Sequence, residues 1–100
     1  MSLHYQLSEK AAKDIADFQA YLVNDNGKRV SDEFVHAIFD KFKLLSEFPG
    51  IGRKRDKISK GLHSFVEVKY NRTIFYRIRK THIFITRVLS SHQDHQSHLR

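Results

Sequence analysis

The pattern of apolar and polar residues predicts a helical first half of the chain. Apolar residues recur at helical spacing at Ala11, Ile15, Phe18 and Leu22. Ser8 stands just before this stripe as a candidate N-cap. A short alternating run at residues 3–7 precedes it and predicts a strand. We expect the helix to stop at residues 24–27, Asn-Asp-Asn-Gly, because Asn and Gly tolerate the left-handed conformation beyond a helix end.

A second amphipathic helix is predicted for residues 28–48. Its apolar positions are Val30, Phe34, Val35, Ile38, Phe39, Phe42, Leu45 and Phe48. This stripe is wide enough to contact both the first helix and a sheet. The short connection between the two stripes indicates an antiparallel helical hairpin. Pro49 and Gly50 then end the helical half of the chain.

Three strand-like runs follow, at residues 62–69, 73–79 and 83–89. Only three residues separate neighbouring runs, so hairpins must join them into an antiparallel meander. In the middle run one face carries Ile74, Tyr76 and Ile78, and the other carries Thr73, Phe75, Arg77 and Arg79. We expect the first face to pack on the helices. The second face should be largely open and cationic, with Phe75 at its centre.

The order of these elements predicts an α+β fold. An N-terminal strand leads into an antiparallel helical hairpin, which packs on one side of a four-stranded sheet completed by the three-stranded antiparallel meander. Residues 1–100 are expected to form a single domain, because a chain of this length builds one core. We place the first strand at an edge of the sheet, and the sequence does not identify its neighbour.

Composition narrows the chemistry. The chain has no cysteine, which excludes disulfides, thiolate zinc sites and cysteine nucleophiles. That composition suits a reducing compartment, and we expect a cytoplasmic protein. No apolar run approaches the length of a membrane span, and no signal-peptide core is visible, so no membrane partner is expected. The formal net charge of +7 indicates an acidic partner, either nucleic acid or protein.

The positive charge is concentrated just after the Pro-Gly corner. Between residues 53 and 60 a single acid, Asp56, stands among the cations Arg53, Lys54, Arg55, Lys57 and Lys60. A packed core does not accommodate so many like charges, so this segment should lie at the surface. The candidates for contacting phosphate groups of a target are Arg53, Arg55 and Lys57 of this segment and Arg72, Arg77, Arg79 and Arg87 from the strand half. Taken singly, each is more often a solvated surface charge.

Histidine is the other residue type with potential for chemistry. His92, His95 and His98 recur at every third position near the C-terminus. A polar terminal segment is typically solvated, so we expect no metal and no cofactor there. His92 directly follows the last strand and His63 stands at the start of the first of the three runs. A histidine held over the sheet face could exchange protons with a ribose hydroxyl, because imidazole titrates near neutral pH.

Several segments, taken in order, carry a family resemblance. They are Tyr-Gln-Leu-Ser at 5–8 with Ala-Ala-Lys-Asp-Ile at 11–15, Phe-Pro-Gly-Ile-Gly-Arg at 48–53, Gly-Leu-His-Ser-Phe at 61–65, Ile-Phe-Tyr-Arg-Ile at 74–78, Thr-Arg-Val-Leu at 86–89 and His-Gln-Asp at 92–94. Together, in a chain of this length, they resemble the RelE/ParE superfamily of toxins from type II toxin–antitoxin systems. The ParE branch fits best, through the Pro-x-Ile-Gly corner, the Gly-Leu-x-Ser-Phe segment and the Arg-Val-Leu ending followed by Gln-Asp.

Resemblance to ParE implies a toxin that poisons DNA gyrase as a protein inhibitor rather than as an enzyme. It also implies a cognate antitoxin with an acidic, partly disordered tail, through which alone the toxin would reach operator DNA. The residues we expect to bind the target are Arg53, Lys54, Arg55, Lys57, Arg77 and Arg87.

Two alternatives stay open. The RelE branch cleaves mRNA on the ribosome with Lys, Arg and a late Tyr, but here Thr73 and Gln93 stand about where Arg is used and no Tyr follows Tyr76. Some mRNA-cleaving relatives nevertheless end in a motif resembling Ser-His-Gln-Asp at 91–94. In such an endoribonuclease, His92 would be the acid and base, and Arg55, Lys57 or Arg77 would stabilise the phosphorane. The other alternative is a non-toxic partner that binds an antitoxin and regulates its operator.

Overall fold

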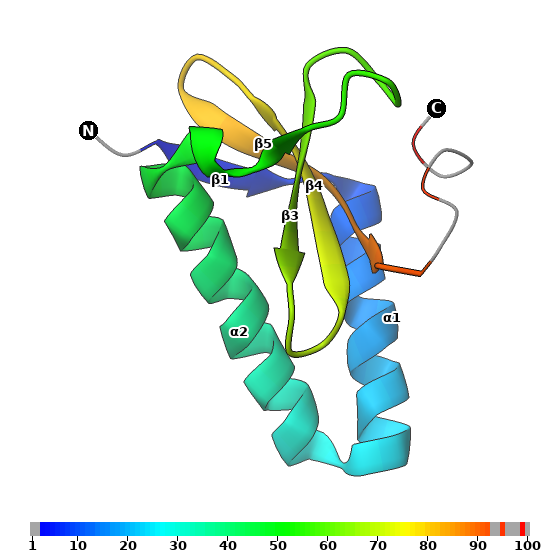
Figure 1. The fold of residues 1–100 in the computed structure, drawn as a ribbon. Coiled ribbons are helices and arrows are strands. Elements are labelled where there is room, and N and C mark those ends of the chain that lie inside the picture. Colours follow the sequence, from blue (N-terminus) through cyan, green and yellow to red (C-terminus); the bar gives the residue numbers. More distant parts are fainter. Residues whose placement is uncertain (1–2, 93–94, 96–98, 100) are drawn as a thin grey trace.

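The computed structural model describes residues 3–92, 95 and 99. The elements are β1 (His4–Leu7), α1 (Glu9–Asn26), α2 (Lys28–Glu47), the 3-10 turn η1 (Pro49–Ile51), β2 (Arg53–Lys54), β3 (Leu62–Glu67), β4 (Arg72–Ile78) and β5 (His82–Ser90). The predicted α+β order is confirmed. Figure 1 shows the two helices as the arms of a V, and in this view the β3–β4 hairpin is seen between them, with its turn pointing toward the end where the helices meet.

The described residues form a five-stranded sheet in the order β1-β5-β4-β3-β2. The predicted meander of β3, β4 and β5 is antiparallel. β1 lies at one edge, as expected, and pairs in parallel with β5, so that His4 is opposite His82. The expectation of four strands was wrong, because β2 pairs with His63 and Ser64 at the other edge. β2 is two charged residues long, and so short a strand has no apolar alternation to mark it.

The helices begin and end close to their predicted bounds. Ser8 caps α1, since its hydroxyl oxygen accepts a hydrogen bond from the Ala11 amide at 2.9 Å. The residues Asn24, Asp25 and Asn26, which we expected to stop the helix, belong to its last turn. Gly27 makes the break instead, with a left-handed φ of 86° that glycine adopts without steric cost. α2 starts at the next residue and ends one residue before the predicted Phe48.

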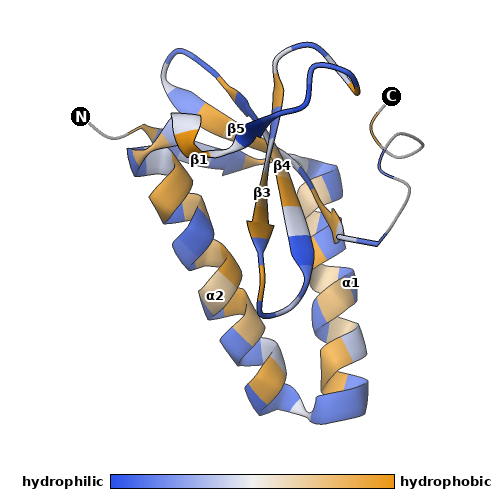
Figure 2. Cartoon of the chain, in the orientation of Figure 1, coloured by the Kyte–Doolittle hydropathy of each residue, from blue (hydrophilic) through white to orange (hydrophobic). Residues whose placement is uncertain are grey.

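The main core lies between the helical hairpin and one face of the sheet. Most residues of the predicted helix stripes are buried there, namely Ala11, Ile15, Leu22, Phe34, Ile38, Phe42 and Leu45. Phe18, Val30, Val35 and Phe39 are only partly buried, and Phe48, just beyond the end of α2, is 54% exposed. Ile74 and Tyr76 of β4 and Ile83 of β5 contribute from the sheet and are fully buried. Figure 2 shows apolar and polar colours alternating along both helices, whereas the loop after β2 is coloured mostly hydrophilic. Among the described residues, no helix is long and apolar enough to cross a membrane.

The opposite face of the sheet is not open at its centre, contrary to the sequence expectation. Phe75 is fully buried there and packs with Leu62 and Leu89 in a second cluster. Ile58 from the loop after β2 and Leu99 cover this cluster. An aromatic side chain in the middle of a sheet face exposes a large apolar area, and covering it is favourable. The cations of this face are therefore confined to its margin.

An irregularity in β5 changes which side chains share a face. The β4–β5 register shifts between Phe75, which is opposite Arg87, and Tyr76, which is opposite Ile85, so Thr86 is an extra residue. The Thr86 hydroxyl donates to the Phe75 carbonyl oxygen at 3.1 Å. As a result Val88 joins Ile85 in the main core although the two are three residues apart. Simple alternation along residues 83–89 does not predict this arrangement.

The β3–β4 turn begins earlier than predicted. β3 ends at Glu67 rather than at residue 69, because the buried Glu67 carboxylate accepts hydrogen bonds from the amides of Lys69 and Tyr70 at 3.0 and 2.8 Å. Asn71 completes the turn with a left-handed φ of 58°. The turn therefore occupies residues 68–71, and β4 starts at Arg72.

Candidate target-binding surface

The basic segment forms a corner whose start is hydrogen-bonded to a core side chain. We use the name basic corner for Arg53, Lys54, Arg55, Lys57 and Lys60. Beneath its start, the buried Tyr76 hydroxyl donates to the Pro49 carbonyl oxygen at 2.7 Å and accepts from the Gly52 amide at 3.1 Å. Burial raises the pKa of Tyr76, an effect that the hydrogen bond from Gly52 reduces. A Tyr hydroxyl buried in this way normally finds partners, and here those partners fix the corner.

Gly52 makes this close approach. A Cβ at this position would overlap the Tyr76 ring and hydroxyl and would lie 2.9 Å from the Ser64 carbonyl oxygen. Only glycine leaves room for the corner to pass so close to β3 and β4. In the sequence this position is the second glycine of the Pro-Gly-Ile-Gly corner, one of the segments that carry the family resemblance.

Backbone hydrogen bonds hold the rest of the basic corner. The Arg55 amide donates to the Leu62 carbonyl oxygen at 2.8 Å, and the Arg55 carbonyl oxygen accepts from the amides of Ile58 and Ser59. The Asp56 carboxylate accepts from the Gly61 amide at 2.9 Å. Arg53, Lys54 and Lys57 are exposed and Arg55 is half-buried. The corner therefore presents its cations from an ordered backbone.

Two other cations named from the sequence serve groups within the chain. Arg77 donates to the Lys60 carbonyl oxygen and to the Ser59 hydroxyl, both at 2.6 Å, and so supports the end of the basic corner. Arg87 makes a forked ion pair with Asp14 of α1, with two N–O distances of 2.8 Å. That hydrogen-bonded pair raises the pKa of Arg87. These two guanidinium groups therefore have a structural role within the chain, unlike the exposed cations of the basic corner.

A groove of about 480 Å³ lies beside the basic corner. It is lined by Ile51, Arg53, Arg55, Ser64, Phe65, Val66, Thr73, Ser91 and His95. The hydroxyls of Thr73 and Ser91 are hydrogen-bonded to each other at 2.9 Å. Two arginines next to hydroxyl groups can hold a phosphate or a carboxylate by charge-assisted hydrogen bonds. The groove is therefore a candidate site for binding an anionic group of the target.

The structure separates the histidines. His92 is exposed, its Nε2 lies 2.7 Å from the Asn71 amide nitrogen, and it is not among the described residues that line the groove. His95, which sequence analysis placed only in a solvated tail, lines the groove; its Nε2 is 2.9 Å from the Ser90 carbonyl oxygen and its ring meets Phe75 edge-on. The His63 ring stacks on Tyr76. His98 lies outside the described residues.

No three His, Cys, Asp or Glu side chains within the described part of the chain are placed to hold a metal ion. Buried Phe75 anchors His95 through the ring contact, and this anchor was missed because Phe75 was expected on an open face. Among the described residues, the groove combines arginines, hydroxyls and a histidine, which is a set that binds anions without a metal.

These features define a class: a small α+β protein that presents exposed cations from a hydrogen-bonded loop at the margin of a sheet. Residues 5–95 match the family model described as ParE toxin of type II toxin-antitoxin system, parDE. The chain belongs to this family, and the resemblance inferred from the sequence is confirmed. A parDE system pairs its toxin with a cognate antitoxin, so such a partner is implied for this chain. No curated protein matches the sequence as a relative.

Solved structures agree on the fold. A structure described as the chromosomal ParDE TA system from P. aeruginosa is similar with a TM-score of 0.78 and 19% sequence identity, over 89% of this chain and 96% of that chain. The solution structure of a conserved hypothetical protein from Helicobacter pylori is similar with a TM-score of 0.51 and 20% identity, over 88% of this chain and 93% of that one. At these identities the similarity establishes the fold alone.

Proposed function

We propose that this protein is a toxin that inhibits DNA gyrase in the cytoplasm and is neutralised by its cognate antitoxin. The observation that carries the proposal is the match to the ParE toxin family over residues 5–95. The form of the basic surface supports it. A binding poison needs a rigid complementary surface and no proton transfer, and the basic corner supplies exposed cations on an ordered backbone.

The target-contacting residues of this proposal are Arg53, Lys54, Arg55 and Lys57. Three of them are exposed and the fourth, Arg55, lines the groove with Arg53. Gyrase acts on DNA, so the target surface includes phosphates as well as protein groups. Arg77 and Arg87 contribute indirectly, Arg77 by holding the Ser59–Lys60 end of the loop and Arg87 by fastening α1 to β5.

A ribosome-dependent endoribonuclease is the second candidate, and one observation favours it. The groove brings His95 together with Arg53 and Arg55. In that function Arg55 would stabilise the charge of the phosphorane, with Lys57 or Arg77 assisting, and His95 or His92 would move the proton. The position of His92 outside the groove lining is less favourable to the role that the sequence suggested for it.

Two assays run side by side test the proposal. The purified protein is added to gyrase in a supercoiling and DNA-cleavage assay, and to ribosomes translating a defined mRNA. We expect loss of supercoiling, trapped DNA breaks and intact mRNA. Cut mRNA with unaffected gyrase would overturn the proposal in favour of the nuclease. If neither assay responds but the antitoxin still binds, the protein is the non-toxic regulatory partner.

Histidine variants sharpen the comparison. His92→Ala and His95→Ala should leave growth arrest intact if the protein is a binding poison. If it is a nuclease, losing the general acid or base lowers the rate by about 10²–10⁴-fold and should abolish arrest. His36→Ala, on the exposed side of α2, is the matched control. Each variant is first shown to be folded by its thermal unfolding curve. A folded, harmless His95→Ala beside toxic wild type and control would contradict the gyrase proposal.

A further inference from the structure

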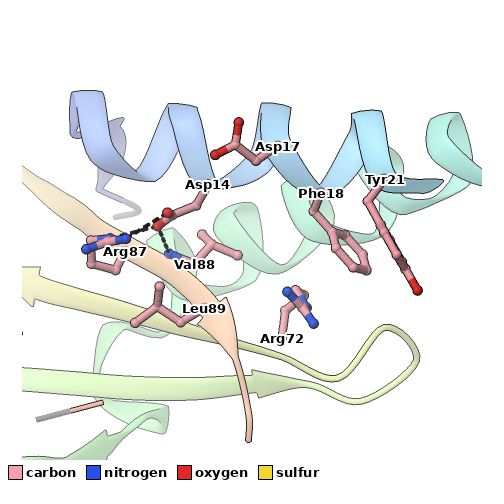
Figure 3. A pocket seen from close by; sticks show the side chains of 8 residues that line it. All are labelled: Asp14, Asp17, Phe18, Tyr21, Arg72, Arg87, Val88 and Leu89. Carbon is pink, nitrogen blue, oxygen red and sulfur yellow. Dashed lines mark hydrogen bonds and ion pairs between the residues drawn. The ribbon is translucent and has the colours of Figure 1, made fainter. Parts of the chain in front are cut away.

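A second charged hollow lies along α1, beside the Asp14–Arg87 ion pair. It occupies about 360 Å³ between α1 and the ends of β4 and β5. Its lining residues are Asp14, Asp17, Phe18, Tyr21, Arg72, Arg87, Val88 and Leu89. Figure 3 shows Arg72 across from Phe18 and Tyr21, apart from the Asp14–Arg87 pair. None of the cations of the basic corner lines this hollow.

Arg72 is held in a fixed position there. Its Nε donates to the Tyr70 carbonyl oxygen at 3.1 Å, and its guanidinium carbon lies 4.0 Å from the centre of the Phe18 ring. The side chain is half-buried, and burial lowers its pKa, an effect that nearby Asp14 and Tyr21 partly offset. Stacking on an aromatic ring orders the planar fork, so a ligand would not have to immobilise it.

The charges around Arg72 leave it without a carboxylate of its own. Both Asp14 oxygens accept from Arg87, and one also accepts from the Val88 amide. Asp17 pairs with Lys13 at 2.8 Å. Of the ion pairs found among the described residues, namely Lys13–Asp17, Arg29–Glu33 and Arg87–Asp14, none includes Arg72. Arg72 is therefore the unbalanced cation of the hollow, and a desolvated guanidinium gains most from a carboxylate that fits its fork.

On the α1 side, two aromatic side chains, Phe18 and Tyr21, line the hollow beside its two aspartates. Tyr21 is 58% exposed. Tyr21 stacks on Phe18, the ring that supports Arg72. A segment that brought an acidic side chain to Arg72 would cover these apolar groups as it did so. Arginine and tyrosine side chains are enriched among the residues that contribute most to binding at protein interfaces.

We propose that this hollow is an anchor site for an aspartate or glutamate side chain of the antitoxin, with Arg72 as its partner and Tyr21 packing beside it. The inference rests on the antitoxin pairing proposed above. The occupant is an acidic residue with apolar neighbours, because the site combines a cation that has no ion pair among the described residues with the aromatic side chains of Phe18 and Tyr21, on a protein of net charge +7. The site shares no lining residue with the basic corner, so the antitoxin and the target would contact different side chains.

The test is calorimetric titration of the full-length toxin with the antitoxin encoded beside its gene. Arg72→Gln should weaken binding by about 10- to 100-fold, since one partner of a desolvated pair is removed. The control Lys80→Gln removes one charge from an exposed turn and should weaken binding by less than about threefold. Arg72→Lys keeps the charge but loses the planar pair of donors of the guanidinium group. It replaces Arg72→Gln in the titration if that variant does not fold, and it should also weaken binding. Tyr21→Ala, at an exposed position, should weaken binding without unfolding the protein.

A double-mutant cycle identifies the acidic residue that occupies the site. Each Asp and Glu of the antitoxin is replaced in turn, and its binding is measured with wild-type toxin and with Arg72→Gln. The replacement of the occupant should weaken binding to wild type but change binding to Arg72→Gln very little. Equal effects of Arg72→Gln and Lys80→Gln would overturn the site while leaving the antitoxin pairing intact. A loss at Arg72 that couples to no acidic residue would also overturn it, because the effect would then be structural. If wild type does not bind the antitoxin, the pairing fails and the anchor site fails with it.

Discussion

Arg87 and Asp14 join the sheet to the first helix through a forked ion pair. The Nε and one terminal nitrogen of Arg87 lie 2.8 Å from the two Asp14 carboxylate oxygens, and the Val88 amide donates to the same carboxylate at 3.0 Å. β1 pairs with β5 only as far as Ile85. Beyond that point the Asp14 carboxylate accepts the hydrogen bond of the Val88 amide, which a carbonyl oxygen of a neighbouring strand would otherwise accept. α1 therefore covers the part of the β5 edge that β1 does not reach.

Asp14→Ala should therefore destabilise the protein far more than the loss of a surface ion pair. The side chains of Arg87 and Asp14 are only 17% and 13% exposed, and the variant removes the carboxylate to which a largely buried cation and an amide both donate. We expect a loss of about 3 kcal/mol in the free energy of unfolding, measured by urea denaturation. Asp17→Ala is the control, because the Lys13–Asp17 pair is exposed and should contribute no more than about 0.5 kcal/mol. Equal losses would contradict this account of Asp14.

Phe42→Ala tests the assignment of the α2 stripe. Phe42 is fully buried between the helices and β1, where its ring meets those of Tyr5 and Phe39. Removing the ring should cost about 3–5 kcal/mol, through lost burial and the cavity left behind. Phe48→Ala removes the same ring from a position that is 54% exposed and should cost less than about 1 kcal/mol. Chemical denaturation of both variants under the same conditions measures the difference.

The helices and the meander could be predicted because their signals are periodic and local. Ser8 and the buried helix stripes need only the chain near them. The faces of the sheet were predicted less well. Thr86 shifts the alternation of β5, and Ile58 and Leu99 cover Phe75 from distant parts of the sequence. Periodicity gives the direction of a side chain within an ideal strand, and it carries no information on bulges or on what covers a face.

The same distinction between local and distant signals applies to the candidate site. Arg53, Lys54 and Lys57 were predicted to be exposed because five cations in one segment cannot be buried together, and they are exposed. The same sequence gave no reason to separate them from Arg77 and Arg87. Those two differ only in having a carbonyl oxygen, a hydroxyl or a carboxylate brought to them by the fold. Partners contributed from far along the chain are invisible to composition and spacing.

Gly52→Ala should disturb the basic corner more than Gly50→Ala. A Cβ at Gly52 would overlap the Tyr76 side chain and crowd the Ser64 carbonyl oxygen, whereas a Cβ at Gly50 would have no neighbour within 4 Å. Overpacking of this kind costs about 1–3 kcal/mol, and the Gly50 variant should stay within about 0.5 kcal/mol of wild type. Amide hydrogen exchange across residues 52–62 should also speed up only in Gly52→Ala. If both variants match wild type, the corner is not held by this close approach.

The Tyr76 hydroxyl should make stability depend on alkaline pH. Burial raises its pKa in the folded protein above the ordinary value of 10.0, so above that pH the unfolded chain loses this proton before the folded one does. The contribution is therefore fully present below about pH 10 and is lost as the pH rises through the folded pKa. Tyr76→Phe should cost about 1–2 kcal/mol at neutral pH, because it removes the hydrogen bonds to Pro49 and Gly52. The gap between wild type and variant should narrow above pH 10 in urea titrations, and a constant gap would show that Tyr76 ionises alike in both states.

The charge of the molecule should speed its association with the antitoxin. The net charge is +7, and an acidic antitoxin tail would be attracted before any contact is made. Stopped-flow measurements should show an association rate that falls by about 10-fold or more from low to high ionic strength, while the dissociation rate changes little. The double variant Lys54→Gln/Lys57→Gln, which neutralises two exposed cations, should associate more slowly and show a weaker dependence on salt. Because neither residue lines the hollow around Arg72, its dissociation rate should match that of wild type. An association rate that is flat across ionic strength would mean that shape and apolar contact, rather than electrostatic attraction, control the encounter.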